Sequence, residues 1–94
     1  MKKIFIDKSE WITLDKLSKF EMTNILAKRA EQIARDNIST LTTEEMQNLP
    51  DDNPALEIAR RELRYRKCPL YVDREIGIRD NCIFVERRNP NEMI

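Results

Sequence analysis

Apolar residues recur every three or four positions between residues 18 and 36, and this spacing predicts an amphipathic helix from Ser18 to about Asp36. One face of that helix collects the apolar side chains Met22, Ile25, Leu26, Ala30 and Ile33. The opening sequence Ser18-Lys19-Phe20-Glu21 is a capping box. In such a box the serine hydroxyl accepts from the Glu21 N–H, and the Glu21 carboxylate accepts from the Ser18 N–H.

A second helix is predicted from Pro54 to about Lys67. Asn53 is a good N-cap, and Pro54 suits the first helical position because its missing N–H is not needed there. The apolar arc of this helix contains Ala55, Leu56, Ala59 and Leu63, widened by Ile58. Pro69 cannot continue the helix, so the chain leaves it in an extended conformation.

Short apolar runs at 70–73 and 82–85 predict two strands, and the segment 77–81 between them can form the turn of a C-terminal hairpin. Residues 3–6 form another short apolar run, which indicates an edge strand or a packing arm. The polar stretch 37–52 is a connection, and 87–94 is expected to be loosely held. We predict a single domain over residues 1–94, mainly α within a small α+β class.

Two charged residues interrupt the apolar arcs, namely Arg29 in the first helix and Glu62 in the second. A charge on an apolar stripe is costly unless it is paired. Arg29 could extend its guanidinium to water, and Glu62 could lie at a rim beside Arg66. Alternatively, the two residues pair across the helices, or one of them binds a partner chain. Replacing Arg29 with Met separates these readings by its effect on partner affinity.

A basic stripe of Arg60, Arg64 and Lys67 runs along the second helix. The favoured interpretation is a solvent-exposed face whose charge is neutralised by Glu57, since exposed ion pairs contribute little to stability or binding. The alternatives are a docking site for an acidic segment and a contact with phosphate. The stripe lacks the interleaved aromatic residues that single-strand binding uses.

Composition limits the possible functions. The 94 residues are 40% hydrophobic and 36% charged, which predicts a core too small for comfortable stability without a partner. The 17 basic and 17 acidic residues cancel, so bulk charge does not indicate nucleic-acid binding. No apolar run approaches membrane-spanning length and no signal peptide is recognisable, so an intracellular location is expected.

Catalytic chemistry is not indicated by the sequence. Histidine is absent and Gly77 is the only glycine, so neither a histidine base nor a glycine-rich phosphate loop is available. We expect no catalytic residue, no cofactor and no metal site. Cys68 follows two basic residues that could activate its thiol, but a small packed residue is favoured. We expect Cys68 and Cys82 to be reduced.

Four blocks of the sequence, in this order and spacing, resemble the omega / subunit K / sixth-subunit family of cellular RNA polymerases. They are Ser18-Lys19-Phe20-Glu21, residues 26–34 from Leu26 to Ala34, residues 53–63 from Asn53 to Leu63, and Lys67-Cys68-Pro69-Leu70. The resemblance covers about residues 12–75, with 76–94 as a variable hairpin and tail. Ala27 and Cys68 depart from the usual glycine and isoleucine, and the tryptophan-containing ending of the eukaryotic branch is missing.

The resemblance implies an omega-like fold and a non-catalytic subunit of a DNA-directed RNA polymerase. Such a subunit packs against the largest subunit, assists assembly and meets DNA only through the complex, in the cytoplasm or nucleus. It implies that Arg29, Gln32 and Glu62 lie near the helix–helix or subunit interface, and that Lys19, Phe20 and Glu21 fix the first helix start. The rival hypotheses are a small nucleic-acid-binding regulatory domain that uses the basic stripe, and a thiol enzyme that uses Cys68.

Overall fold

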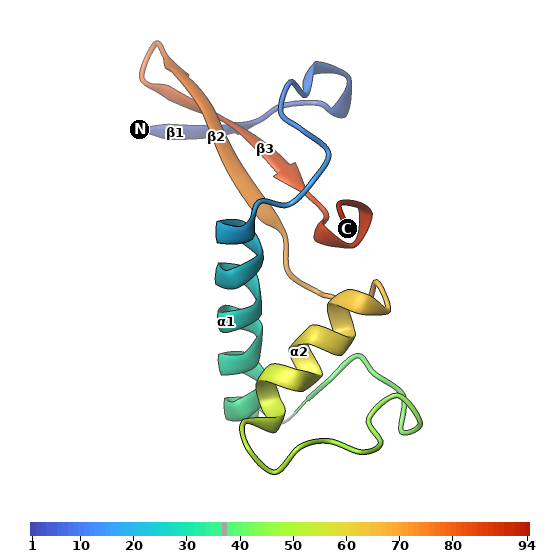
Figure 1. Ribbon diagram of the computed structural model, residues 1–94. Helices are drawn as coiled ribbons and strands as arrows, with labels where there is room; N and C mark the ends of the chain where they lie inside the picture. The colour runs from blue at the N-terminus through green and yellow to red at the C-terminus, as the bar shows by residue number, and fades with distance from the viewer. Residues whose placement is uncertain (37) are drawn as a thin grey trace.

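The fold is described for residues 1–36 and 38–94 of a computed structural model; Asn37, the first residue of the predicted connection, lies outside the described residues. The elements are β1 (Lys2–Phe5), η1 (Lys8–Glu10), α1 (Lys19–Asp36), α2 (Pro54–Arg64), β2 (Val72–Arg79), β3 (Cys82–Arg88) and η2 (Pro90–Glu92). They form an elongated molecule of 50 × 23 × 20 Å, with the sheet in one half and the two helices in the other (Figure 1).

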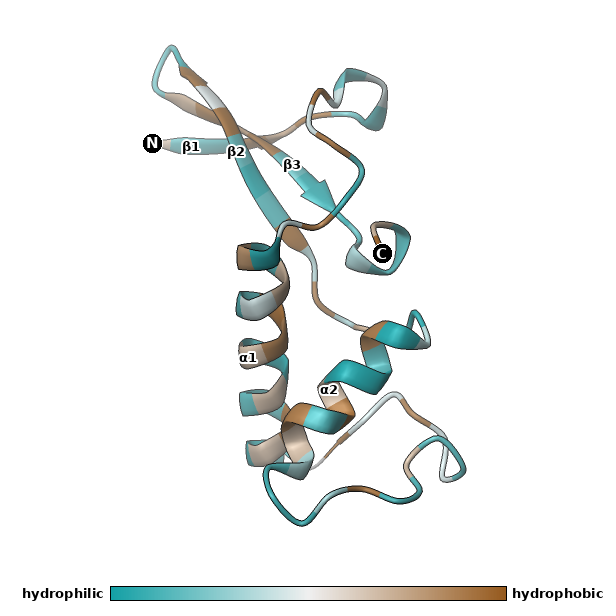
Figure 2. Ribbon diagram, in the orientation of Figure 1, coloured by the Kyte–Doolittle hydropathy of each residue, from teal (hydrophilic) through white to brown (hydrophobic). Residues whose placement is uncertain are grey.

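The first helix begins as the sequence predicts. The Ser18 N–H donates to Glu21 Oε1, and the Glu21 N–H donates to Ser18 Oγ, each over 3.0 Å, so the capping box is confirmed. Hydrophobic residues are interspersed with hydrophilic ones along both helices, and the apolar sides are the ones that pack together (Figure 2).

The second helix ends at Arg64, three residues before the predicted end at Lys67. Arg66 adopts a left-handed conformation with φ of 60°. The Lys67 N–H donates to the Glu62 carbonyl over 2.7 Å, and the Arg66 N–H donates to the Leu63 carbonyl over 3.1 Å. This is a Schellman ending, which forms here without the glycine that usually signals it.

The sheet has the strand order β1-β3-β2, with β1 parallel to β3 and β2 antiparallel to it. The predicted C-terminal hairpin and edge strand are therefore present, but β2 continues through Gly77 to Arg79. The turn is made by Asp80 and Asn81, whose φ angles of 53° and 63° suit Asp and Asn. Gly77 instead follows a β-bulge at Ile76. With three strands beside two helices, the molecule is a small α+β fold, and "mainly α" understates its sheet.

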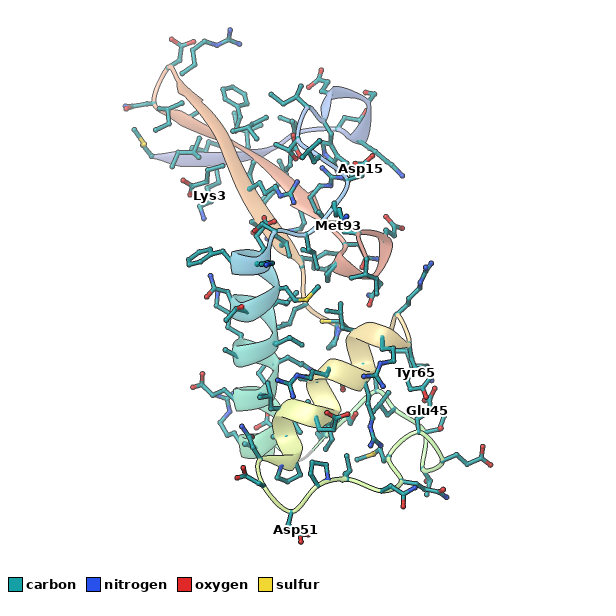
Figure 3. All side chains as sticks on the ribbon, viewed as in Figure 1. Lys3, Asp15, Glu45, Asp51, Tyr65 and Met93 are labelled. Carbon is teal, nitrogen blue, oxygen red and sulfur yellow. The ribbon has the colours of Figure 1, made fainter. Side chains whose placement is uncertain are left out.

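The chain after β3 is packed, so the prediction of a loosely held tail was wrong. Met93 is only 4% exposed and packs in a cluster with Leu17, Ile25 and Leu63. The Asn91 side chain makes two hydrogen bonds of 2.9 Å with the backbone of Cys68. Figure 3 shows Met93 at the junction of the sheet and the helix pair. The tail thus connects the two halves of the molecule.

A second apolar cluster lies under the connection between the helices. It contains Ile33, Leu41, Ile58 and Ala59, with Met46 and Leu49 packed against them.

Among the described residues, neither helix has the length and apolar character needed to cross a membrane.

Candidate functional site

A buried ion pair joins α1 to α2. Arg29 Nε donates to Glu62 Oε1 over 2.6 Å, and Arg29 Nη2 donates to Glu62 Oε2 over 3.0 Å. The Glu62 side chain has no exposed surface and the Arg29 side chain is 10% exposed. Glu62 is therefore not a rim residue paired with Arg66, and Arg29 does not extend its guanidinium into water. The structure shows the pairing across the helices that was one of the two sharper alternatives.

The same carboxylate holds the start of the connection. Glu62 Oε2 accepts from the Ser39 hydroxyl over 2.7 Å and from the Thr40 N–H over 3.0 Å. Gln32 Oε1 accepts from Arg29 Nη1 over 3.1 Å. Burial acts to raise the pKa of Glu62, but the hydrogen bonds from Arg29, Ser39 and Thr40 outweigh it and hold that pKa below its ordinary value. Glu62 is thus an anion inside the fold.

Three predicted interface residues, Arg29, Gln32 and Glu62, therefore meet at the helix–helix contact. Because Glu62 is fully covered, it can influence a partner only through the shape and rigidity of the helix pair. A role of these residues in contact with another subunit stays a prediction.

The predicted basic stripe is interrupted, because α2 ends at Arg64 and Lys67 lies beyond it. Arg60 and Arg64 are exposed and line a groove between α1 and α2 of about 270 Å³. Lys67 instead donates from Nζ to Glu45 Oε1 over 2.6 Å and helps to hold the connection. The stripe is therefore not one continuous surface of three free cations.

Arg61, which was not among the predicted site residues, holds the rest of the connection. Its guanidinium donates to the backbone carbonyls of Glu45, Gln47 and Asn48 over 3.0, 2.5 and 3.2 Å. The Glu57 carboxylate accepts from Arg61 Nε over 3.2 Å and orients it. The spacing of Glu57 and Arg61 gave a weak signal for the pair, but nothing in the sequence indicates the carbonyl contacts.

The helix-start residues differ in what they do. Glu21 accepts two hydrogen bonds of 2.8 Å from Arg74, which lies on β2. These bonds lower the pKa of Glu21 to about 2, and Arg74 is the largest cause. Lys19 and Phe20 are exposed, and Phe20 borders a second groove of about 390 Å³. At the other helix, Asn53 Oδ1 accepts from the Leu56 N–H over 3.4 Å, ahead of Pro54 at the first position.

A second buried acid, Glu86 on β3, anchors the chain that precedes α1. It accepts from the backbone N–H groups of Ile12 and Thr13 over 2.8 and 3.1 Å, from the Thr13 hydroxyl, and from Arg88 over 2.9 Å. Burial acts to raise the pKa of Glu86, yet these bonds lower it to about 2. Nothing in the sequence distinguishes Glu86, because acidic and basic residues crowd the end of β3.

The structure argues against a reactive thiol at Cys68. The residue is buried in the apolar cluster with Leu17 and Met93, and burial raises the pKa of its thiol despite a hydrogen bond from the Leu70 backbone. A raised pKa leaves less thiolate at neutral pH, so the favoured prediction of a small packed residue is confirmed and the alternative of an activated thiol is not supported. Within residues 1–36 and 38–94, no three acidic, cysteine or histidine side chains gather in a way that would hold a metal ion.

Comparison with known proteins gives a consistent result. The model of the family described as RNA polymerase Rpb6 matches residues 13–70. Two curated relatives are homologs of DNA-directed RNA polymerase subunit 6 in African swine fever virus, one from a Namibian warthog isolate and one from a Kenyan pig isolate. Each is 37% identical over 91 residues, which is 96% of this chain and 57% of the relative. The chain thus spans little more than half the length of these relatives.

Proposed function

The chain belongs to the RNA polymerase Rpb6 family, and we propose that it acts as a non-catalytic accessory subunit of a multi-subunit DNA-directed RNA polymerase. The observation that carries this proposal is the family match over residues 13–70, which spans both helices and the buried pair of Arg29 and Glu62 between them. In this role the chain works in transcription through contact with protein, and DNA is met only by the assembled enzyme.

We further propose that its partner is the largest subunit of the polymerase and that binding promotes assembly and stability. The support is physical. A buried ion pair fixes the relative position of two helices but adds little net stability. The pair of Arg29 and Glu62 therefore defines the geometry of α1 and α2 while stabilising it only weakly. An interface of standard size would cover surface that the isolated chain leaves exposed, such as Phe20 at 76% and Tyr71 at 63%. We propose that the whole of residues 1–94 forms one omega-like domain in that complex.

The test is co-expression of the tagged chain with the largest polymerase subunit from the same source. Recovery of a stoichiometric pair after size-exclusion chromatography, and a higher yield of assembled core when the chain is present, are the expected results. A folded chain that separates completely from that subunit would rule out the proposed function. Strong DNA binding by the isolated chain that falls steeply with salt would instead favour the nucleic-acid alternative.

A further inference from the structure

The groove between α1 and α2, called here the α1–α2 groove, has an apolar floor and a basic rim. It is lined by Met22, Leu26, Arg60, Leu63, Arg64 and Ile94. Met22 and Leu26 are one turn apart on α1, and Arg60 and Arg64 are one turn apart on α2. Each pair therefore presents two side chains separated by about 6 Å along its helix axis.

The two arginines of the rim are available to a partner. Arg60 approaches Glu57 at 3.9 Å with its side chain 53% exposed, whereas Glu57 is held more closely by Arg61. Arg64 is exposed and makes no ion pair within the described part of the chain. The neighbouring cation Lys67 is engaged by Glu45. The rim thus carries one guanidinium group with only a long contact of 3.9 Å to Glu57, that of Arg60, and one, that of Arg64, with no ion pair among the described residues.

We propose that the α1–α2 groove binds an acidic segment of a partner protein, with apolar side chains seated on Met22, Leu26 and Leu63 and carboxylates facing Arg60 and Arg64. Charge complementarity selects this occupant, because guanidinium groups pair with carboxylates in a bidentate geometry. Acidic residues four apart on a helix, or two apart on a strand, match the spacing of the two arginines.

Other occupants fit the groove less well. A volume of about 270 Å³ is at or below the lower end of typical small-molecule pockets, which span roughly 300–1,000 Å³. Single-stranded nucleic acid uses aromatic side chains as stacking platforms, and the residues that line this groove include none. An apolar floor with a rim of two arginines resembles the surfaces that bind amphipathic peptides.

The direct test uses two synthetic amphipathic peptides with the same leucine pattern, one with Glu and Asp at its polar positions and the other with Lys. Binding to the full chain is followed by fluorescence anisotropy and by methyl NMR of Met, Leu and Ile. We expect the acidic peptide to bind, to shift the methyl signals of Met22, Leu26 and Leu63, and to bind more weakly as salt rises. The double variant Arg60→Glu, Arg64→Glu should weaken binding at least about tenfold, since two attractions become repulsions.

Two control variants separate charge from folding. The double variant Lys2→Glu, Lys3→Glu makes the same change of charge on β1, in the sheet half of the molecule, and should leave binding unchanged. Replacing both rim arginines with Lys keeps the charge but removes the bidentate geometry, so it should weaken binding by less than the charge reversal does. Equal binding of the basic peptide, methyl shifts away from the groove, or full affinity in the charge-reversed variant would overturn the proposal. So would preferential binding of single-stranded DNA, or dimerisation through the groove at the concentrations used.

The same variants distinguish this proposal from the proposed function on which its partner rests. If the wild-type chain binds the largest polymerase subunit and the charge-reversed chain does not, the acidic segment belongs to that subunit. If both bind it equally while the peptide still occupies the groove, the function stands and the assignment of this groove to that subunit is refuted. If neither binds it but the acidic peptide does, the proposed function fails and the groove proposal survives.

Discussion

Replacement of Arg29 by Met tests the buried pair most sharply. Met retains most of the length and helix propensity of Arg but removes the two hydrogen bonds of 2.6 and 3.0 Å to Glu62. The Glu62 carboxylate would then stay fully buried with only Ser39 and Thr40 as donors. An uncompensated buried charge of this kind costs about 3–5 kcal/mol. A domain of this length has roughly 5–14 kcal/mol of stability, so the variant should lie near the limit of folding.

A double-mutant cycle measures the coupling between the two residues. Glu62→Met alone leaves the Arg29 guanidinium buried without its partner, so it should also cost several kcal/mol. The double variant should cost much less than the sum of the single changes, because neither charge is then left uncompensated. The matched control is Arg35→Met on the same helix, whose side chain is 65% exposed and forms an exposed ion pair with Asp36. This control should change stability by less than about 0.5 kcal/mol.

Urea unfolding followed by far-UV circular dichroism gives these free energies, and pH gives an independent check. In the wild type the pKa of Glu62 is lowered, so its contribution is present at neutral pH and is lost only as acid protonates the folded carboxylate. Without Arg29, burial dominates and raises the pKa of Glu62. Protonation of Glu62 then removes the cost of burying an unpaired carboxylate. The difference in free energy of unfolding between the wild type and Arg29→Met should therefore decrease from pH 7 to about pH 5. The reasoning would be refuted if each single variant lost less than 1 kcal/mol, if the two losses were additive, and if the difference between the wild type and Arg29→Met did not depend on pH.

Three further outcomes follow from the other contacts. Glu21 should contribute on the order of 3 kcal/mol to the free energy of unfolding above pH 4.5, and this contribution should be lost as the pH falls towards about 2. Urea unfolding measured across this pH range should show a smaller decrease in stability for Arg74→Ala than for the wild type. Native Cys82 should react with a thiol reagent at least about tenfold faster than Cys68, whose thiol is buried and has a raised pKa, and urea should remove the difference. Trp11→Phe should cost less than about 1 kcal/mol in thermal unfolding, because it deletes a buried indole N–H that has no hydrogen-bond partner in the described part of the chain.

Local signals in the sequence were sufficient for the starts of the two predicted helices. The capping box at Ser18 and the Asn53-Pro54 start fix where α1 and α2 begin, because the residues that make each cap lie within one turn of each other. The end of α2 was placed too late because Arg66 takes a left-handed conformation in which Gly or Asn is more common. The hairpin was found, and its turn lies within the predicted segment 77–81, but β2 continues through Gly77, so that the Asp80-Asn81 pair alone makes the turn.

Contacts between residues far apart in sequence were beyond the reach of pattern analysis. The buried pair of Arg29 and Glu62 could be named as one alternative because each charge interrupts an apolar periodicity. The anchoring of Thr13 by Glu86 spans 73 positions and interrupts no such periodicity. The packed tail was missed for the same reason: Met93 is an ordinary apolar residue until the fold brings it against Leu17.

The distribution of buried charge bears on why the chain would act as a subunit. Among the described residues, the buried apolar side chains form two small clusters, and the chain segments near them are held by Glu62 in the helix half and by Glu86 in the sheet half. A buried carboxylate with several donors fixes one arrangement of the chain, but its desolvation offsets most of what those bonds contribute. The geometry of the helix pair is therefore specified more strongly than it is stabilised. Burial of exposed apolar surface against a larger protein would add to the free energy of unfolding of the helix pair and leave its geometry unchanged.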